Sequence, residues 1–398
     1  MRAVLYGAGN IGRGFIGQLF SASGYSLTFI DVNEKLINEI NEKKSYTVRI
    51  LDKLYPEDIV VKNVSAVNGN DIEAVARAIA DADIMSTSVG VNVIKFIAKP
   101  IAEGIKLRYS ESNFKPLNII ICENLIDADK YIHKLISENL NYDEKEKFNK
   151  YVGLVEASVG RMVPIQTEDM KEGDELRVCV EKYGVLPVNK DAFLGDSANL
   201  VNIIPCSNFE FYVKRKLFVH NMGHAMCAYL GNISGLEYIY QAVNVPETEL
   251  FAIRAMNESA RSLSKEYGYD IQQLNMHIEN LLYRFSNELL GDTIKRVGND
   301  LKRKLSPNDR LIGAIKNCFE QGIEPWYLCA GVAAAMFFED ANLAGYSAEK
   351  ILDEISGLEK NKWYDFIIDC YNFLNNNKDV KSFYSFVKTQ VNNNIKAF

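Results

Sequence analysis

Gly7-Ala8-Gly9-Asn10-Ile11-Gly12 is the stretch that decides the fold of the first half of the chain. It follows an apolar strand candidate at 3–6 and opens a helix whose apolar residues recur as far as Phe20. A second strand candidate, 26–30, ends at Asp31. A strand, G-x-G-x-x-G, a helix, a strand and an acid in this order are typical of a dinucleotide-binding unit. A glycine turn with only a structural role is the alternative.

The residues of this loop suit a phosphate ligand. Gly7 permits a tight turn, Gly9 lets the backbone approach a pyrophosphate, and Gly12 lets the helix and strand pack closely. The start of the helix supplies free N–H groups and a partial positive charge. We therefore predict that the residues that bind the cofactor include Gly7, Gly9, Asn10, Ile11 and Gly12.

Asp31 stands where the adenosine ribose of a bound dinucleotide is expected. A carboxylate there accepts hydrogen bonds from the ribose hydroxyls and repels a 2′-phosphate. The sequence therefore predicts NAD as the cofactor, in preference to NADP. An ordinary acid in a turn is the alternative for this residue.

Strand and helix candidates continue to alternate after Asp31, which indicates a doubly wound parallel sheet. Strands are expected near 47–51, 58–62, 84–88 and 118–122, with helices at 33–43, 71–81, 89–105 and 130–149; short strands at 175–183 and 185–188 are expected to extend the sheet. Ligands bind beyond the carboxyl ends of such strands. We therefore predict that the strand ends Thr87-Ser88-Val89-Gly90 and Glu123-Asn124 face the cofactor, with Ser88, Val89 and Asn124 as binding residues. An ordinary turn asparagine remains open for Asn124.

The pattern loosens at 189–207 and changes to long helical periods afterwards. We predict a Rossmann-type domain at 1–200, with an α/β fold and extra strands, and an all-α substrate and catalytic domain at 201–398. The expected helices of the second domain are 211–230, 235–243, 246–266, 270–283, 307–321, 325–339, 346–356 and 361–374.

An apolar, helix-like run in the second domain carries Lys216, Asn221 and His224. At about 100° per residue on an α-helix, Asn221 lies about 140° and His224 about 80° from Lys216, so the three share one broad arc. A neutral lysine accepts a proton, an asparagine hydrogen-bonds without charge, and a histidine titrates near neutrality. A polar stripe that faces solvent is the alternative.

Residues 295–304 hold five cations and one anion, although the chain as a whole has a net charge of −7. Arginine offers a bidentate fork and lysine a point charge for an anion. The segment is therefore a candidate site for a phosphorylated or carboxylated substrate. A solvated face of a charged helix is the alternative.

Composition narrows the class of protein. The acidic balance argues against a nucleic-acid partner and against a membrane-surface protein. Seven cysteines are scattered without a C-x-x-C pair, which favours reduced thiols in a cytoplasmic protein over a disulfide framework or a zinc site. We see neither a leader segment nor an apolar run that could span a membrane.

The glycine loop and several other motifs resemble those of the polyol-specific long-chain dehydrogenases, the mannitol dehydrogenase family. They are Gly7 to Gly17, Cys122-Glu123-Asn124, Arg215-Lys216-Leu217-Phe218, Asn221-x-Gly223-His224-Ala225, Arg296-Val297-Gly298 and 303–311. Lys-x4-Asn-x2-His is the signature of that family. The chain departs from the expected pattern at His220-Asn221-Met222 and at Val159-Gly160-Arg161.

The resemblance implies roles for four residues. Lys216 would be the general base that takes the proton of the alcohol, Asn221 and Asn124 would hydrogen-bond the developing oxyanion, and His224 would anchor a neighbouring hydroxyl. A lysine must lose its proton to act near neutral pH, and a partly desolvated site beside other cations favours that. A zinc dehydrogenase is not expected, because only two of the four histidines are close in sequence.

The resemblance also implies the substrate and the residues that bind it. Arg296 and Lys304 match cations that bind the substrate, and Arg303 and Arg161 are added as candidates. The expected reaction is D-mannitol 1-phosphate and NAD⁺ to D-fructose 6-phosphate and NADH, by a monomer or small homo-oligomer. A free mannitol 2-dehydrogenase or a fructuronate or tagaturonate reductase is the alternative.

Overall fold

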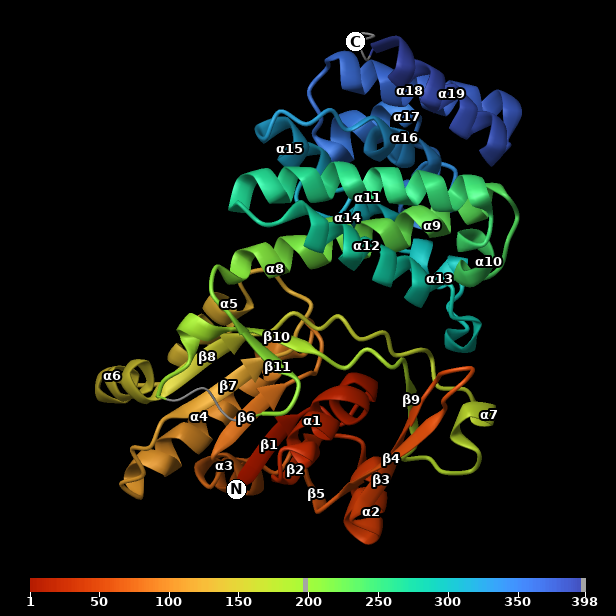
Figure 1. Ribbon diagram of the computed structural model, residues 1–398. Coiled ribbons are helices and arrows are strands. Elements are labelled where there is room, and N and C mark those ends of the chain that lie inside the picture. The colour runs from red at the N-terminus through yellow and green to blue at the C-terminus, as the bar shows by residue number, and fades with distance from the viewer. Residues whose placement is uncertain (196–199, 395–398) are drawn as a thin grey trace. The chain divides into compact units, whose positions relative to one another are not determined.

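The computed structural model describes residues 1–195 and 200–394, and the chain forms two compact units, Met1–Phe209 and Glu210–Phe398 (Figure 1). The division predicted from sequence falls at 200/201. Part of the loosened stretch around it, residues 196–199, lies outside the described residues.

Six parallel strands form the main sheet of the first unit, in the spatial order β5-β2-β1-β6-β7-β8. Numbered along the chain, this is the order 3-2-1-4-5-6 of dinucleotide-binding folds. The predicted Rossmann-type sheet is therefore confirmed. The strands are β1 (Arg2–Tyr6), β2 (Ser26–Asp31), β5 (Val64–Asn68), β6 (Ile84–Thr87), β7 (Leu117–Ile121) and β8 (Val152–Glu156).

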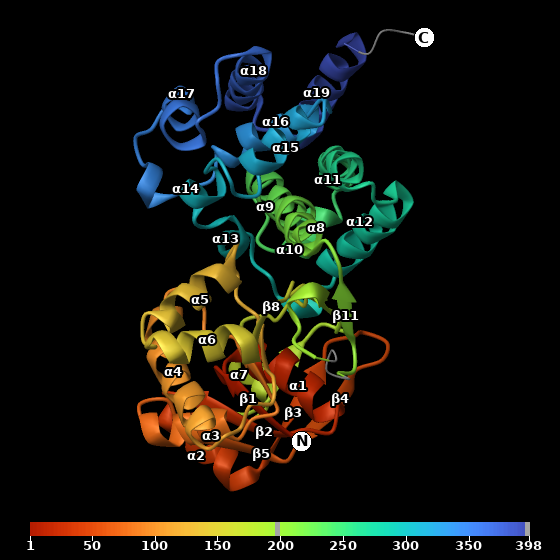
Figure 2. The same cartoon turned by 90° about the vertical axis from the view of Figure 1, so that its left-hand side faces the viewer.

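Helices cover both faces of this sheet (Figure 2). Successive residues of a strand point to opposite faces, so on β1 Ala3 and Leu5 pack with residues of η1, α1 and α2, whereas Val4 and Tyr6 pack with residues of α3, α4 and α5. The helices are η1 (Gly12–Gly17), α1 (Gln18–Ala22), α2 (Glu34–Lys43), α3 (Ile72–Ala80), α4 (Ile94–Ser110), α5 (Ala128–Ser137) and α6 (Tyr142–Tyr151).

Two of the strands predicted for the main sheet lie in a smaller one. β3 (Ser45–Ile50) pairs antiparallel with β4 (Glu57–Lys62) and parallel with β9 (Val178–Val180). The third strand of the main sheet is β5, which the sequence prediction missed. β4 and β5 are separated by Asn63 alone, whose φ of 58° turns the chain sharply. A break of one residue is too short to be recognised from the hydrophobic periodicity of the sequence.

The prediction that 175–183 and 185–188 extend the main sheet is wrong. β9 pairs with β3, and β10 (Leu186–Asn189) pairs with β11 (Ile203–Cys206). Val178 and Val180 belong instead to the core that covers η1, where a Cβ added at Gly14 would lie 2.8 Å from each of them. The short α7 (Glu168–Lys171) and η2 (Lys190–Ala192) complete this part of the chain.

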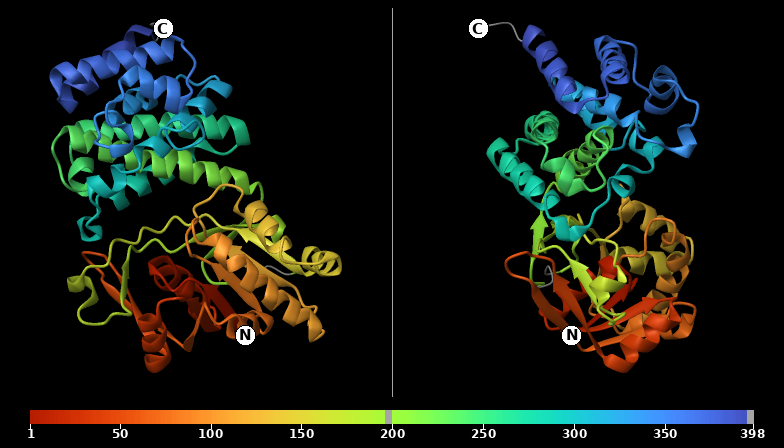
Figure 3. Two further views of the ribbon diagram at one scale, coloured as in Figure 1. Left: turned by 180° about the vertical axis from the view of Figure 1, so that it is seen from behind. Right: turned by 90° about the vertical axis from the view of Figure 1, so that its right-hand side faces the viewer.

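From Glu210 to Asn394 every regular element that the structure describes is a helix, which confirms the helical second half (Figure 3). The longer helices are α9 (Met222–Ile233), α11 (Pro246–Tyr267), α12 (Ile271–Phe285), α15 (Ile312–Glu320), α16 (Trp326–Ala335), α18 (Lys362–Asn377) and α19 (Val380–Asn394). The shorter ones are α8 (Phe209–Arg215), η3 (Lys216–Asn221), α10 (Ile239–Val243), η4 (Glu288–Leu290), α13 (Ile294–Gly298), α14 (Leu301–Lys304), η5 (Ala341–Leu343), α17 (Ala348–Lys350) and η6 (Ile351–Ser356).

Three details of the predicted helices are wrong. The single helix at 130–149 is two, because Asn141 begins α6 with a reciprocal cap to Glu144. The single helix at 211–230 contains a π-helical segment, η3. The last helix, α19, was not predicted. Among the helices in the described parts of the chain, none combines the length and apolar composition that a membrane crossing requires.

Candidate active site

The glycine loop follows β1 in the centre of the six-stranded sheet, at the switch point between β1 and β6. Gly7 has a φ of 101°, and a Cβ there would lie 2.5 Å from the carbonyl oxygen of Ser88. At Gly9, by contrast, a Cβ would meet no atom of the described residues within 4 Å. Gly7 is therefore required by the fold, whereas the face at Gly9 is open for a ligand to approach the backbone, as a pyrophosphate needs.

Asp31, the last residue of β2, is fixed against this loop. Its Oδ2 accepts a hydrogen bond from the Ala8 N–H at 2.8 Å, and its Oδ1 accepts one from the Asn33 N–H at 3.0 Å. The carboxylate is half-buried, and its two oxygens can accept more hydrogen bonds than these two. This arrangement fits the predicted role of Asp31 at the ribose of a dinucleotide.

The loop that follows β6 is held by Glu123, which the sequence placed at the cofactor edge of the sheet without indicating its hydrogen-bond partners. Glu123, buried at the end of β7, accepts hydrogen bonds from the backbone N–H groups of Val89 at 2.9 Å and Gly90 at 2.8 Å. Ser88 and Val89 are half-buried beside it, and Asn124 is exposed. The sequence does contain a signal for this role, an acid directly after an apolar strand. A carboxylate that is buried there needs hydrogen-bond partners.

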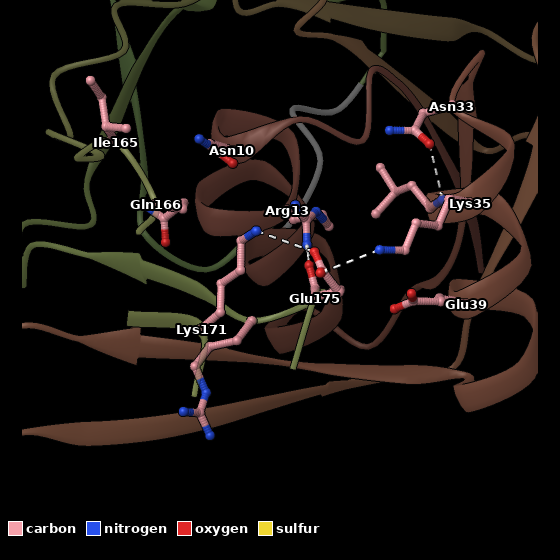
Figure 4. A pocket seen from close by; sticks show the side chains of 11 residues that line it. Asn10, Arg13, Asn33, Lys35, Glu39, Ile165, Gln166, Lys171 and Glu175 are labelled. Atoms are coloured by element: carbon pink, nitrogen blue, oxygen red, sulfur yellow. Dashed lines mark hydrogen bonds and ion pairs between the residues drawn. The ribbon is translucent and has the colours of Figure 1, made fainter. Parts of the chain in front are cut away.

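A cavity of about 330 Å³ adjoins the glycine loop and the turn after β2 (Figure 4). Asn10 and Asn33 line it, together with an ion-pair network in which Glu175 contacts Lys35 at 3.3 Å and Lys171 at 3.2 Å. Arg13 reaches the same wall and donates hydrogen bonds to the Ala8 and Leu176 carbonyls. The wall of this cavity is thus rich in cations, but Glu175 contacts two of them, Lys35 and Lys171.

Arg161 is engaged by the first unit itself. Its guanidinium is buried and donates to Gln18 Oε1 at 2.7 Å and to the carbonyls of Gly14 at 3.1 Å and Glu181 at 2.9 Å. Burial lowers the pKa of Arg161 to about 10. These contacts give Arg161 a structural task, and its predicted contact with substrate stays a prediction.

In the second unit, Lys216 begins and Asn221 ends the π-helical segment η3. Hydrogen bonds from i to i+5 define such a segment, so its turn is wider than that of an α-helix and Asn221 lies closer to Lys216 in projection than the roughly 140° of an α-helix. Both residues are half-buried, whereas Phe218, Val219 and His220 between them are buried. The bulge therefore turns the predicted base and the predicted oxyanion ligand to one side of the helix.

His224 follows on α9, a helix that is buried on almost every side. Its ring stacks on Phe285 with centroids 4.6 Å apart and an interplanar angle of 15°. Its Nε2 lies 3.0 Å from Asp292 Oδ2, and the other oxygen of Asp292 accepts a hydrogen bond from Arg296 Nε at 2.8 Å. Asp292, which the sequence prediction did not include, thus joins the predicted hydroxyl ligand to a predicted substrate cation.

Further cations in and beside the basic segment are also partnered. Arg303 contacts Asp300 and Asp309, and Arg310 contacts Asp309 at 2.8 Å. Lys304 is buried and donates to the carbonyls of Val297 and Asn299. Burial, with Arg310 and Arg303 nearby, lowers the pKa of Lys304 to about 8. Lys304 is thus part of a compact charge network, whereas Lys295, Arg296, Lys302 and Arg303 of the same segment are exposed.

Two more histidines lie near this site. Burial, followed by the charge of Arg284, lowers the pKa of His220 well below its ordinary value. Burial also lowers the pKa of His277 to about 3. Both rings are therefore neutral at physiological pH. No cluster of three or more metal-ligating side chains occurs in residues 1–195 or 200–394.

The strand order, the glycine loop with its carboxylate and the separate helical unit define a two-domain dinucleotide-dependent dehydrogenase. The profile of the mannitol dehydrogenase Rossmann domain matches residues 1–202, and that of the mannitol dehydrogenase C-terminal domain matches residues 208–362. The chain belongs to the mannitol dehydrogenase family.

Two relatives show how far the similarity extends. The chain is 39% identical over 351 residues to a mannitol-1-phosphate 5-dehydrogenase of Brevibacillus brevis, covering 87% of this chain and 89% of that one. It is 37% identical over 372 residues to a mannitol-1-phosphate 5-dehydrogenase of Thermoanaerobacter pseudethanolicus, covering 91% and 94%.

Solved structures confirm the fold at much lower identity. Pseudomonas fluorescens mannitol 2-dehydrogenase, in a ternary complex with NAD and D-mannitol, is 15% identical with a TM-score of 0.74, over 98% of this chain and 94% of that one. A substrate-free D-sorbitol dehydrogenase is 15% identical with a TM-score of 0.83, over 96% and 95%.

Proposed function

We propose that this protein is an NAD-dependent dehydrogenase that interconverts D-mannitol 1-phosphate and D-fructose 6-phosphate. The family and the two relatives named mannitol-1-phosphate 5-dehydrogenase support this activity. The observation that carries the choice of substrate is the array His224–Asp292–Arg296, followed by the buried Lys304. It joins a group suited to a sugar hydroxyl to cations suited to a phosphate.

The first unit fits NAD. The open backbone face at Gly9 leaves room for the pyrophosphate, and Asp31 is placed to accept hydrogen bonds from the ribose. Ser88 and Val89 lie at the carboxyl edge of the sheet, where Glu123 accepts the N–H groups of Val89 and Gly90. When bound, NAD supplies the acceptor for the hydride that leaves the alcohol carbon.

The second unit supplies the acid–base chemistry. Neutral Lys216 takes the proton of the hydroxyl that is oxidised, while the C–H bond gives up its hydride and the C–O bond becomes a carbonyl. Asn221 donates its amide N–H to the developing oxyanion, and Asn124 is proposed to do the same. In the reverse direction protonated Lys216 returns the proton. His224 holds a neighbouring hydroxyl, and Arg296 with Lys304 holds the phosphate.

Initial rates with NADH test this proposal directly. We expect D-fructose 6-phosphate to be reduced far more efficiently than fructose, fructuronate or tagaturonate, because only the phosphate engages the cations fully. Preferred reduction of a free sugar or of a uronate would replace this substrate with one of the family alternatives. Omission of NADH and replacement by NADPH are the matched controls.

Two attributes of the protein belong to the same proposal. We expect the enzyme to act in the cytoplasm, where its substrates are phosphorylated metabolites and its seven cysteines stay reduced. We expect a monomer or a small homo-oligomer that binds no nucleic acid. Light scattering coupled to size-exclusion chromatography measures the oligomeric state.

A further inference from the structure

Asp292 is the most constrained carboxylate near the proposed site. Its side chain is only 9% exposed, yet both oxygens have partners, His224 on one side and Arg296 on the other. Its backbone is anchored as well, because its carbonyl accepts the N–H of Ile239 at 2.9 Å, and the neighbouring Ile294 N–H donates to Glu237 at 2.8 Å. Asp292 therefore has little freedom to move away from the histidine.

The charge of Asp292 is maintained despite its burial. Burial alone would raise the pKa of this carboxyl, but the contacts with His224 and Arg296 outweigh that effect and lower the pKa below its ordinary value. Asp292 is thus a carboxylate at neutral pH, and a carboxylate can only accept hydrogen bonds.

The environment of the His224 ring favours one arrangement of its proton. Stacking on Phe285 fixes the plane of the imidazole, and the buried Nε2 lies 3.0 Å from Asp292 Oδ2, an ion-pair contact and not a well-directed hydrogen bond. In a neutral imidazole one nitrogen carries the proton, and the partner of that nitrogen decides which one it is. A carboxylate next to Nε2 favours the proton there and leaves Nδ1 as a hydrogen-bond acceptor.

We propose that Asp292 is a positioning residue that holds His224 in the Nε2–H tautomer and, through its other oxygen, fixes Arg296. Nδ1 of His224 then accepts a hydrogen bond from a hydroxyl of the substrate, while the guanidinium stays available to the phosphate on its exposed side. One carboxylate thereby sets the separation between the hydroxyl site and the phosphate site. The role at substrate rests on the proposed function, whereas the tautomer does not.

The tautomer can be measured without any substrate. Nitrogen NMR of histidine-labelled protein at mildly alkaline pH distinguishes Nε2–H from Nδ1–H, and the chain has only four histidines, so His224→Gln assigns the signal. In the wild type we expect His224 as Nε2–H. A wild-type His224 found as Nδ1–H would overturn the proposal, and this measurement does not depend on how any Asp292 variant folds.

Asp292→Asn tests whether Asp292 determines the tautomer of His224. An asparagine of the same shape can offer an amide N–H to Nε2, so we expect His224 to switch to Nδ1–H. Asp309→Asn is the matched control, because Asp309 also neutralises arginines of this region and contacts no histidine among the residues that the structure describes. It should leave the His224 tautomer unchanged. If His224 keeps its Nε2 proton in Asp292→Asn, Asp292 does not set the tautomer.

Kinetics then separate positioning from mere structural support. By analogy with the wrong-tautomer effect in serine proteases, we expect kcat for D-fructose 6-phosphate to fall roughly 10²- to 10⁴-fold in Asp292→Asn, with the affinity for NADH unchanged. A general loss of folding would weaken NADH binding too. If the tautomer behaves as expected but the wild type does not reduce D-fructose 6-phosphate, the proposed function fails and the positioning of His224 stands.

Discussion

Lys216 is the residue on which the proposed chemistry depends most directly. A base acts in the chemical step and contributes little to cofactor binding, so Lys216→Ala should lower kcat by several orders of magnitude and leave NADH affinity nearly unchanged. Single-turnover rates and NADH fluorescence titration measure the two effects separately. Activity within about tenfold of the wild type would exclude Lys216 as the base.

Lys304 gives the site a pH dependence of known sign. Its pKa, lowered to about 8, means that the ammonium is protonated below that pH and neutral above it. We therefore expect the KM for D-fructose 6-phosphate to rise as the pH increases through about 8. In Lys304→Met the KM should be high at every pH and lack this step. Equal steps in both proteins would assign the titration to another group.

Cofactor choice should depend on Glu175 as well as Asp31. Asp31→Ser removes the charge that repels a 2′-phosphate, but Glu175 still neutralises Lys35 and Lys171 in the adjoining cavity. Adding Glu175→Gln should free Lys35, while Lys171 keeps its contact with Glu168 at 2.8 Å. We therefore expect kcat/KM with NADPH to rise roughly three- to tenfold further, a modest gain because these side chains are partly exposed. If the double variant matches Asp31→Ser, Glu175 has no part in cofactor choice.

The sequence predicted most of these residues by type and position, but not their partners. Lys216, Asn221 and His224 were found because polar residues interrupt an apolar helix. Asp292 was missed, and Glu123 was expected only to face the cofactor. Neither acid shows its partner until the chain brings it against His224 or the Val89 N–H, which lie 68 and 34 positions away respectively. Hydrogen-bond partners so distant in sequence leave no periodic signal.

At the scale of elements, the π-helical segment η3 is the feature that sequence periodicity could not supply. Lys216 to Asn221 has the same apolar pattern as the helix around it, and an α-helical projection placed the two residues about 140° apart within one broad arc. The extra residue in the π-helical turn narrows that separation. Single π-turns inside longer helices are frequent at functional sites, which makes η3 itself a structural argument for the site.

Helix α16, which is buried on all sides, depends on a carboxylate at its start. Glu258 is buried and accepts the N–H groups of Tyr327 and Leu328, both at 2.9 Å. Burial raises the pKa of Glu258 to about 8 in spite of these hydrogen bonds. Between the ordinary pKa of a glutamate and that value, the folded protein binds more protons than the unfolded chain, so the contribution of Glu258 to stability falls as the pH rises.

Glu258→Ala should therefore have two effects. It leaves two buried N–H groups unpaired and should lower the free energy of unfolding by about 1–3 kcal/mol for each. It should also remove part of the decline in stability between about pH 5 and 8 that the wild type shows. Urea unfolding over this range measures both. An unchanged pH slope in the variant would mean that Glu258 is not the group that titrates.

At the scale of the whole molecule, the order of strands and helices fixed the class but not the sheet to which each strand belongs. Alternation from 3 to 122 indicated a doubly wound sheet, and the six-stranded order confirms it. The assignment of 47–51, 58–62, 175–183 and 185–188 failed because pairing is a long-range property: β9 joins β3 across more than a hundred residues. Strand propensity indicates that a segment forms a β-strand. Packing against the core that covers η1 decides with which other strand it pairs.

The charge distribution of the whole chain leads to the last prediction. A protein with a net charge of −7 repels a sugar phosphate in general, so binding has to come from the local cations. Charge-assisted contacts are worth about 1.5–3 kcal/mol each, so Arg296→Met or Lys304→Met should raise the KM for D-fructose 6-phosphate roughly 10- to 100-fold. Fructose, which lacks the phosphate, should be affected much less, so the difference in KM between the two substrates should become smaller.

Lys295→Met is the control on the same helix, because Lys295 is exposed and makes no ion pair within the described residues. If both substrates lose the same factor in Arg296→Met, this arginine holds the sugar hydroxyls or the fold, and a free-polyol dehydrogenase becomes the better description.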